Sequence, residues 1–294
     1  MPRLGPAWHE ETLKASLREP LAGWHVELLP EIDSTSSELM RRGHQMDYRS
    51  TVLLAEHQSA GRGRSGQAWL SEPHQSLTVS MARTLAPPSW MGLSLACGVG
   101  VVQALSAYLP FDRVADGLSD PHKPGRLGLK WPNDLWTWEA SGPAKVGGLL
   151  IETQSLRSAP AQGRSQASSP ARFCVVGLGL NLRTPQSPAS GPLSPPPKGL
   201  VDLGVTLATR AQAHALLASV VVSLAHTLNQ FEAHGFAAFQ HEFDRMDCLR
   251  GRQVTLSDAR HGLAMGVNEH GELLLGVGNE VHCVQAASVS IRPL

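Results

Sequence analysis

The stretch QSAGRGRSGQAW, residues 58–69, decides between two classes of fold. Its Gly61, Gly63 and Gly66 have the GxGxxG spacing of a dinucleotide-binding loop. That loop requires a helix to begin at the glycines, so that the helix N-terminus faces a pyrophosphate. Here QAWLSEPH follows, with a proline at position 73, and no helix is predicted. The glycine spacing therefore does not indicate a dinucleotide-binding fold.

The same loop carries Arg62 and Arg64 between its glycines. A kinase glycine-rich loop is excluded, because Ala68 stands where valine is expected and no HRD or DFG motif follows. Arginine presents a planar fork of donors that suits phosphate and carboxylate oxygens, and glycine lets the backbone close over a ligand. The loop is therefore either an anion-binding flap or a surface turn with solvated arginines.

Charge and composition exclude several classes of protein. The chain has 294 residues with 25 Lys and Arg against 25 Asp and Glu, so its formal net charge is zero. A chain that binds bulk nucleic acid or an anionic membrane would favour a basic excess. No apolar stretch approaches the roughly 20 residues that cross a bilayer, and the N-terminus lacks the apolar segment of a signal peptide. The four cysteines form no CxxC pair, which predicts free thiols in a cytoplasmic protein.

Apolar runs and alternation predict secondary structure along most of the chain. Strands are expected at residues 24–32, 51–56, 76–83, 127–131, 146–153 and 172–182. Helices are expected at residues 9–18, 90–109 and 209–230, with a further helical run that ends near Leu249. Thr35 and Glu38 have the spacing of a capping box. Short alternating strands after Gly251 predict a small β-barrel.

These elements suggest three parts: an N-terminal extension (1–20), a large domain (21–247) and a small β-rich domain (248–294). The extension has room for one helix, whereas a helix-turn-helix needs two, so no DNA-reading module is expected there. Two low-complexity inserts, residues 155–172 and 184–199, are expected to be solvated loops and not part of a site.

Polar residues at strand ends supply further candidates. Lys130 ends an apolar strand in LKWPND, where burial is costly without an anion; alternatively, its stem lies along the surface and its ammonium reaches water. Paired glycines open the strand in KVGGLLIE, and Asn181 ends the glycine-bearing strand in GLGLNL. The hydroxyls of Ser34, Thr35 and Ser36 are either helix caps or a seat for a polar ligand group.

Taken in order, the motifs DSTSSEL, EHQSAGRGRSGQAW, LKWPNDL, KVGGLLIE and VVGLGLNL resemble the bacterial biotin protein ligases, in the form without an N-terminal DNA-binding domain. The resemblance covers residues 24–294. It implies an α+β fold: a class II tRNA-synthetase-like catalytic domain with a mixed β-sheet, plus a small C-terminal SH3-like β-barrel. It implies that biotin and MgATP give biotinyl-5′-AMP and pyrophosphate. A lysine of the biotin carboxyl carrier protein of acetyl-CoA carboxylase then takes the biotin and releases AMP.

The resemblance also implies roles for individual residues. The catalytic residues are Lys130 and Arg64. Biotin is expected to contact Ser34, Thr35, Ser36, Gln58, Arg62, Gly63, Arg64, Lys130, Gly147 and Gly148. The nucleotide is expected to contact Arg62, Arg64, Trp69, Lys130, Asn133 and Asn181. Ser36 stands where the family often has asparagine, and Gln67 stands where it often has arginine; no metal ligands are identified.

The expected chemistry agrees with these residue types. Joining a carboxylate to a phosphate brings two anions together, and Arg62, Arg64, Lys130 and Mg²⁺ would offset their repulsion. Three alternatives stay open: a biotin-sensing repressor, a lipoate ligase, and a binding protein without turnover. The carrier protein is the expected partner, with no specific DNA binding and no membrane, and the chain is expected to be a monomer or a weak homodimer.

Overall fold

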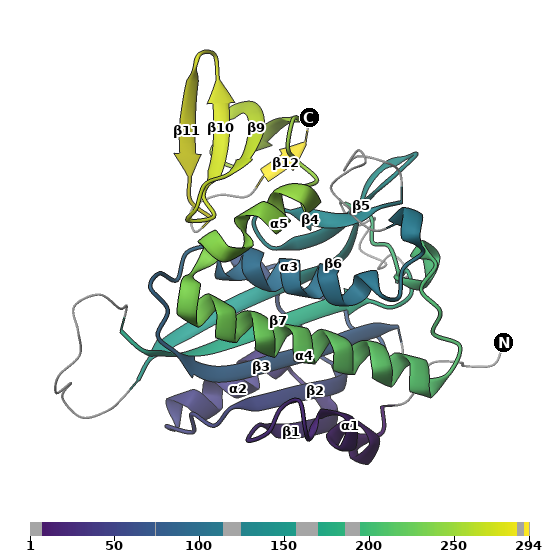
Figure 1. Ribbon diagram of the computed structural model, residues 1–294. Helices are drawn as coiled ribbons and strands as arrows, with labels where there is room; N and C mark the ends of the chain where they lie inside the picture. The colour runs from purple at the N-terminus through teal and green to yellow at the C-terminus, as the bar shows by residue number, and fades with distance from the viewer. Residues whose placement is uncertain are drawn as a thin grey trace.

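A seven-stranded sheet forms the centre of the computed structural model, which describes residues 8–73, 75–113, 125–156, 170–185, 195–286 and 291–293 (Figure 1). The strand order is β1-β2-β3-β7-β6-β5-β4. β1 and β2 are parallel and every other neighbouring pair is antiparallel, so the sheet is mixed. The strands are β1 (His25–Ile32), β2 (Thr51–Gln58), β3 (Ser76–Leu85), β4 (Leu127–Lys130), β5 (Asp134–Glu139), β6 (Gly142–Ser155) and β7 (Arg172–Asn181). The predicted α+β class with a mixed sheet is confirmed.

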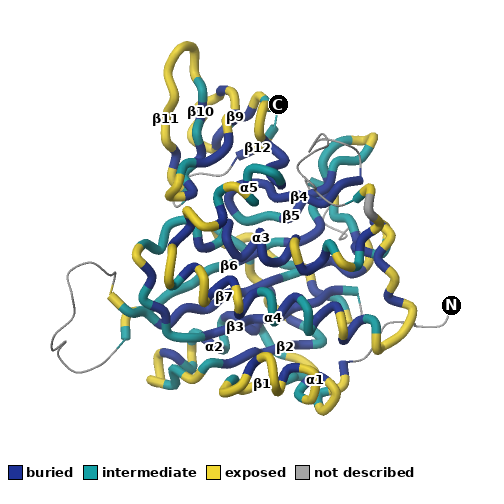
Figure 2. Tube along the Cα trace, viewed as in Figure 1, coloured by how far each residue is buried: buried dark blue, intermediate teal, exposed yellow. Residues whose placement is uncertain are grey.

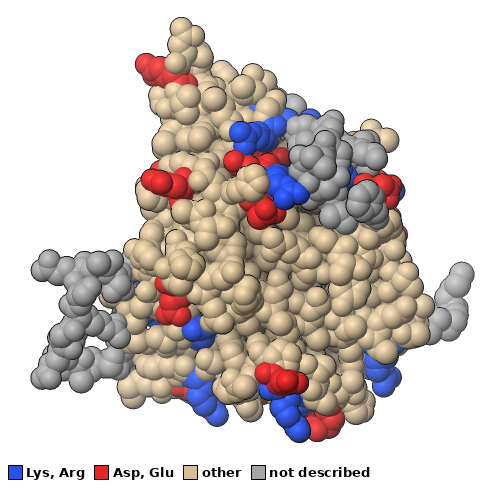
Figure 3. All heavy atoms as spheres, viewed as in Figure 1, with Lys and Arg blue, Asp and Glu red and all other residues tan. Residues whose placement is uncertain are grey.

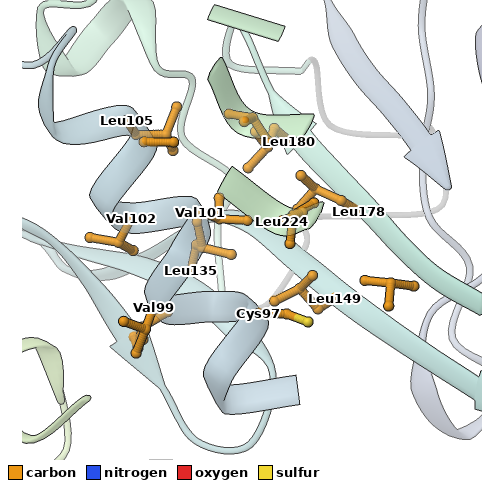
Figure 4. Close-up of a cluster of buried hydrophobic side chains, with 14 of the residues drawn as sticks. Cys97, Val99, Val101, Val102, Leu105, Leu135, Leu149, Leu178, Leu180 and Leu224 are labelled. Carbon is orange, nitrogen blue, oxygen red and sulfur yellow. The ribbon is translucent and has the colours of Figure 1, made fainter. Parts of the chain in front are cut away.

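Helices cover both faces of the sheet, because side chains alternate between the faces along each strand. Helices α3 (Leu93–Ser106) and α4 (Arg210–His234) cover one face and bury Leu178 and Leu180 of β7 against Leu224 of α4 (Figure 4). Helix α2 (Thr35–His44) lies on the other face, where a smaller cluster joins Leu39 to Phe173. The central strands are accordingly buried along most of their length (Figure 2).

Helix α4 corrects the expectation that no apolar stretch approaches the length of a membrane span. Within the described parts of the chain, it is the one helix long and apolar enough to cross a bilayer by length and composition. A capping box at Thr209 starts the helix, and its leucines and valines belong to the main core. Its apolar character therefore serves packing against α3 and the sheet.

One helix precedes the sheet in residues 8–24. Helix α1 (Glu10–Leu17) buries Leu13 and Leu17 and packs against α4 and β1. The ring of Trp8 stacks on His214 of α4, with ring centroids 5.7 Å apart. The remaining helical elements are α5 (Gln240–Met246) and the 3₁₀ turns η1 (Arg64–Gly66), η2 (Phe111–Arg113), η3 (Val201–Leu203) and η4 (Phe236–Phe239).

The β-rich tail forms a second, five-stranded antiparallel sheet in the order β11-β10-β9-β8-β12. Its strands are β8 (Gln253–Leu256), β9 (His261–Val267), β10 (Leu273–Val277), β11 (Glu280–Val284) and β12 (Ile291–Pro293). The buried indole of Trp131 donates a hydrogen bond of 3.1 Å to the carbonyl oxygen of Gly271, which ties this sheet to the strand that carries Lys130. The division at residue 248 stays a prediction.

Three local predictions were wrong. The N-cap of α2 is Ser34 and not Thr35, because the Ser34 hydroxyl accepts from the backbone N–H of Ser37 at 3.4 Å. Glu38 binds Arg41 and Arg42 and closes no capping box.

Strand β5 was missed, because Pro132 and Asn133 suggest a turn and conceal the short strand that follows. Strand β6 begins at Gly142, four residues before the expected position.

The second insert differs from expectation where it is described. Residues 157–169 and 186–194, the greater part of both inserts, lie outside the described residues. The end of the second insert is not a free loop: the backbone N–H of Lys145 donates to Pro196 at 2.8 Å, and that of Lys198 donates to Lys145 at 2.8 Å. The proline run therefore lies along β6, where its lack of N–H donors is tolerated at an edge.

A buried carboxyl group stands where α5 leads into the second sheet. Asp247 is 1% exposed, and its Oδ1 accepts from the backbone N–H of Leu249 at 2.8 Å. The neighbouring Cys248 N–H donates to the carbonyl oxygen of Leu129 in β4 at 2.8 Å. Burial raises the pKa of Asp247 to about 7. The segment that covers β4 thus contains an acid that favours its neutral form.

Asp247→Asn is expected to reduce the pH dependence of stability. Between about pH 4 and pH 7 the folded state keeps a proton that the unfolded state has lost, so the free energy of unfolding falls as pH rises. Asparagine removes this titration, and the fall between pH 5 and pH 8 should shrink by roughly 2 kcal/mol. Urea unfolding at the two pH values measures it.

The exposed Asp258→Asn is the matched control, since Asp258 pairs with Arg260 at the surface and its pKa is lowered by that hydrogen bond. This control should leave the change between pH 5 and pH 8 as in the parent protein. An equal change in both variants would contradict the assignment to Asp247.

Candidate functional site

A cavity of about 640 Å³ opens on the sheet face that lies away from α3 and α4. β3 and β7 supply its floor, since Ser80, Gly177 and Gly179 alternate with the core residues Val79 and Leu178. The wall contains these predicted site residues: Ser34, Thr35, Ser36, Gln58, Arg62, Gly63, Arg64, Trp69, Lys130, Asn133, Gly148 and Asn181. Residues far apart in sequence thus meet in one cavity.

Gly147 does not line this cavity. A Cβ atom at this position would lie 2.6 Å from the carbonyl oxygen of Gly179 in the neighbouring strand β7. Its neighbour Gly148 does face the cavity, where a Cβ would lie 3.2 Å from Oδ1 of Asp134. The paired glycines therefore serve two purposes, close strand approach at the first and space for a carboxylate at the second.

One end of the cavity is neutral and polar. The backbone N–H and the hydroxyl of Thr35 both donate to Oε1 of Gln58, at 2.7 and 2.9 Å. The hydroxyl of Ser80 lies 2.7 Å from that of Thr35 and 2.9 Å from that of Ser36. All four side chains are buried. They form a continuous wall of hydrogen-bonding groups without a formal charge.

The other end carries two lysines on one carboxylate. Nζ of Lys145 lies 2.7 Å from Oδ1 of Asp134, and Nζ of Lys130 lies 3.6 Å from Oδ2. Lys130 also lies over the ring of Trp136, 5.3 Å from its centroid. Two ammonium groups and one carboxylate leave a positive charge of one at this end, before the arginines are counted.

The alternative in which Lys130 reaches water is wrong, because its side chain is only 8% exposed. Burial lowers the pKa of Lys130, and the nearby Asp134 opposes that shift. The side chain of Lys145 is 31% exposed and borders the cavity. Lys145 is therefore the more accessible cation, and Lys130 is the inner one.

The glycine loop folds back on itself as a narrow hairpin. The N–H of Trp69 donates to Gly61 at 2.9 Å, and Arg62 and Ala68 form an isolated antiparallel bridge. The guanidinium of Arg62 binds the carboxylate of Glu152 on β6 at 2.9 Å. Arg62 is thus paired with an anion on the sheet, although its side chain is still 45% exposed to solvent.

Arg64 reaches in the other direction, toward the strand turn and the second sheet. Its guanidinium donates to Oδ1 of Asn133 at 3.4 Å and to the carbonyl oxygen of Ala286. Burial lowers the pKa of Arg64, and Asp134 opposes the shift. The guanidinium retains its charge in any case, because the ordinary pKa of arginine exceeds 12. The Arg64 guanidinium therefore adds a further positive charge to the cavity, beside the two lysines.

Trp69 lies against the floor of the cavity. A Cβ atom at Gly179 would lie 2.6 Å from Cζ2 of Trp69, so only glycine lets the indole rest on β7. Nζ of Lys145 lies 5.9 Å from the centroid of the Trp69 ring. The amide of Asn181 donates to the carbonyl oxygen of Lys145 at 3.1 Å and fixes the backbone beside this ring.

Sequence reasoning missed four residues of the site: Ser80, Asp134, Lys145 and Glu152. The last three stand within the quoted motifs LKWPND and KVGGLLIE, so the motifs marked the region without identifying the ion pairs. Ser80 could have been found from the alternation of β3, in which it lies between the apolar Val79 and Met81. The proline run of the second insert also borders the cavity, contrary to the prediction that it belongs to no site.

Comparison with known proteins identifies relatives along nearly the whole chain. A model of the biotin/lipoate A/B protein ligase family matches residues 28–166. A biotin--[acetyl-CoA-carboxylase] ligase of Mycobacterium tuberculosis is 30% identical, over 98% of this chain and 97% of the relative. The bifunctional ligase/repressor BirA of Escherichia coli is 28% identical, over 92% of this chain and 75% of BirA.

A solved structure has the same fold. The biotin protein ligase from Aquifex aeolicus, determined in complex with biotin and ATP, superposes with a TM-score of 0.66 and covers 92% of this chain and 99% of its own. The two sequences are 23% identical, so this likeness concerns the fold alone. The M. tuberculosis relative confirms the resemblance: the chain belongs to the biotin protein ligase family.

Gly179→Ala is expected to displace Trp69 and open the glycine loop. Overpacking of this kind costs on the order of 1–3 kcal/mol, so the open loop should be populated roughly five-fold to 150-fold more. Trypsin cleavage after Arg62 and Arg64, followed by mass spectrometry, measures the opening. Cleavage at these two sites should be accelerated by about the same factor.

Gly276→Ala is the control, since its Cβ would come closest to the flexible thioether of Met265, at 3.0 Å, and would lie at ordinary contact distance, 3.6 Å, from the carbonyl oxygen of Leu263. It should leave cleavage at Arg62 and Arg64 unchanged. Unaltered cleavage in the Gly179→Ala protein would show that the indole does not hold the loop.

Proposed function

We propose that the protein is a biotin–protein ligase, which activates biotin with ATP to biotinyl-5′-AMP and transfers the biotin to a lysine of the carrier protein of acetyl-CoA carboxylase. One observation supports this most directly. A neutral hydrogen-bonding wall and a cluster of four cations border the same cavity. A substrate with an uncharged polar ring at one end and an anion at the other fits that division.

The neutral wall is assigned to the biotin ring. Ser34, Thr35, Ser36 and Gln58 offer hydroxyl and amide groups to a ureido edge, and Gly177 of β7 lets the Ser36 hydroxyl pack against the floor beside it. Arg62, Gly63 and Gly148 lie further along the wall and are assigned to the valeryl chain and its carboxylate. Gly147 would act through the packing of β6 against β7 and not by direct contact.

The cationic end is assigned to the reacting carboxylate and the nucleotide. Adenylation brings two anions together, and fixed positive charge lowers the cost of that approach. Both lysines line the cavity; Lys145, the more exposed one, is assigned to the reacting oxygens, while Lys130, on the other oxygen of Asp134, adds to the positive charge. Trp69, Asn133 and Asn181 are assigned to the nucleotide, beside Arg62 and Arg64.

Mg²⁺ is assigned to the phosphates of ATP. The described residues hold no group of three or more His, Cys, Asp or Glu side chains that could bind a metal. The carboxylates of Asp134 and Glu152 already bind cations. Mg²⁺ commonly keeps several waters and binds through substrate phosphates, so these residues fit an ion that enters with the nucleotide.

The glycine loop is assigned to retention of the adenylate, which water would otherwise hydrolyse. Arg62 and Arg64 tie the two sides of the loop to Glu152 and to Asn133, so closure over a ligand would exchange these partners for ligand oxygens. The loop then releases the adenylate to the carrier lysine, whose amine attacks the acyl carbon and displaces AMP.

The remaining assignments concern partners, oligomeric state and location. The carrier protein is the partner and no specific DNA binding is expected; the balance of 25 basic and 25 acidic residues is also unlike that of a protein that binds bulk nucleic acid. The face covered by α3 and α4 carries few charged side chains in its described part (Figure 3). A monomer or a weak homodimer in the cytoplasm is the proposed state.

The function is tested by incubating the full chain with a biotin carboxyl carrier domain, biotin and MgATP. Mass spectrometry should find one biotin on the carrier, and none when ATP is omitted or when the acceptor lysine is replaced by arginine. Lipoate serves as the competing acid. Transfer of lipoate in place of biotin, or no transfer, would contradict the proposal.

The two lysines are tested by Lys145→Ala and Lys130→Ala. Lys145→Ala should slow biotin-dependent ATP–pyrophosphate exchange by roughly 100-fold, as removal of one charge-stabilising group commonly does. Biotin affinity should change less than about ten-fold, because the ring is bound elsewhere. Lys130→Ala should slow exchange less and lower the unfolding temperature, since it removes a buried partner of Asp134.

If Lys130→Ala slows exchange more than Lys145→Ala does, Lys130 and not Lys145 contacts the reacting oxygens. Biotin titration by calorimetry on the same preparations separates a loss of binding from a loss of chemistry.

A further inference from the structure

The buried hydroxyls of the neutral wall can hold their protons in one order only. The backbone N–H of Thr35 must donate, so the atom of Gln58 that lies 2.7 Å away is the amide oxygen and not the nitrogen. The Thr35 hydroxyl lies 2.9 Å from the same oxygen and must also donate to it. Both lone pairs of this amide oxygen are therefore used.

The order then propagates along the wall. The single hydroxyl proton of Thr35 is already donated to Gln58, so in the contact of 2.7 Å with Ser80 the Ser80 hydroxyl must be the donor. The Ser80 proton is then donated to Thr35, so in the contact of 2.9 Å with Ser36 the Ser36 hydroxyl must be the donor. The series runs from Ser36 through Ser80 and Thr35 to Gln58.

This order fixes what the wall offers to a ligand. Ser36 faces the cavity with lone pairs and no free proton, whereas Gln58 keeps its Nε2 protons for donation. Gly177 maintains the arrangement, because a Cβ at that position would collide with the hydroxyl of Ser36. A ligand group beside Ser36 must therefore bring an N–H or O–H of its own.

We propose that Ser36, polarised through Ser80, is an acceptor-only group that makes the cavity selective for a ring with an N–H donor at this position. The inference rests on the proposed function, since a cyclic urea supplies N–H donors beside a carbonyl oxygen. Ser36 is thus a specificity-determining residue, and Ser80 is a positioning residue that acts through it. An oxygen in place of the N–H would face the lone pairs of Ser36 and be rejected.

The probes are biotin and its two cyclic carbamate analogues, in each of which one ureido N–H is replaced by a ring oxygen. Calorimetric titration of the full chain without ATP measures each dissociation constant. The parent protein should prefer biotin over at least one carbamate by about ten-fold or more, which is the effect of one unmade buried hydrogen bond.

The variants Ser80→Ala and Ser36→Ala give different signatures. Ser80→Ala removes the acceptor of the Ser36 proton, so Ser36 can turn and donate to the carbamate oxygen. That carbamate should bind several-fold more tightly than to the parent protein. Ser36→Ala removes the acceptor itself, so biotin should bind about ten-fold more weakly, while the carbamate, relieved of the repulsion, should bind at least as tightly as before. Ser59→Ala, at a residue outside the cavity, should leave both constants unchanged.

An unchanged preference in Ser80→Ala would overturn the proposal. If Ser80→Ala lowers the unfolding temperature, the proposal is tested by Ser36→Ala alone. Equal loss of affinity for biotin and for the carbamate in that variant would overturn the proposal. A parent protein that binds no biotin, or that fails to label the carrier, would instead contradict the proposed function. The two failures are therefore distinguishable.

Discussion

The carboxylate of Asp134 is the group on which the arrangement of the cavity depends. It is the anion that lets two ammonium groups stand together inside a largely buried region, at 2.7 Å for Lys145 and 3.6 Å for Lys130. Without a counter-charge, burial of the Lys130 ammonium, whose side chain is 8% exposed, would be costly. With one carboxylate for two lysines, the pair still leaves an excess positive charge that an anionic substrate can use.

The sheet supplies the geometry in which that charge is useful. β7 pairs with β3 on one side and with β6 on the other, so its glycines lie at the centre of the floor. Gly177 makes room for the hydroxyl of Ser36, and Gly179 makes room for the indole of Trp69. The same strand buries Leu178 and Leu180 in the main core on its opposite face. One alternating strand therefore joins the stability of the fold to the shape of the site.

Much of this arrangement could be predicted from sequence, for identifiable reasons. Apolar alternation located six of the seven strands of the main sheet, because each of those strands is long or bordered by turn residues. β5 was missed because it begins directly after a proline turn. The ion pairs could not be predicted, since they depend on the register that places Asp134 opposite Gly148 on β6. Nor could the sequence distinguish Lys130 from Lys145, because their difference in exposure is set by tertiary packing.

A crystal structure of the protein with biotinyl-5′-AMP, or with a non-hydrolysable analogue of it, tests the central claim most directly. The phosphate should lie within about 4 Å of Nζ of Lys145, the distance of an ion pair. The biotin ring should lie against Ser36 and Gln58, with the loop of Arg62 and Arg64 closed over the ligand. A phosphate bound away from both lysines, or a biotin ring at the cationic end of the cavity, would contradict the central claim.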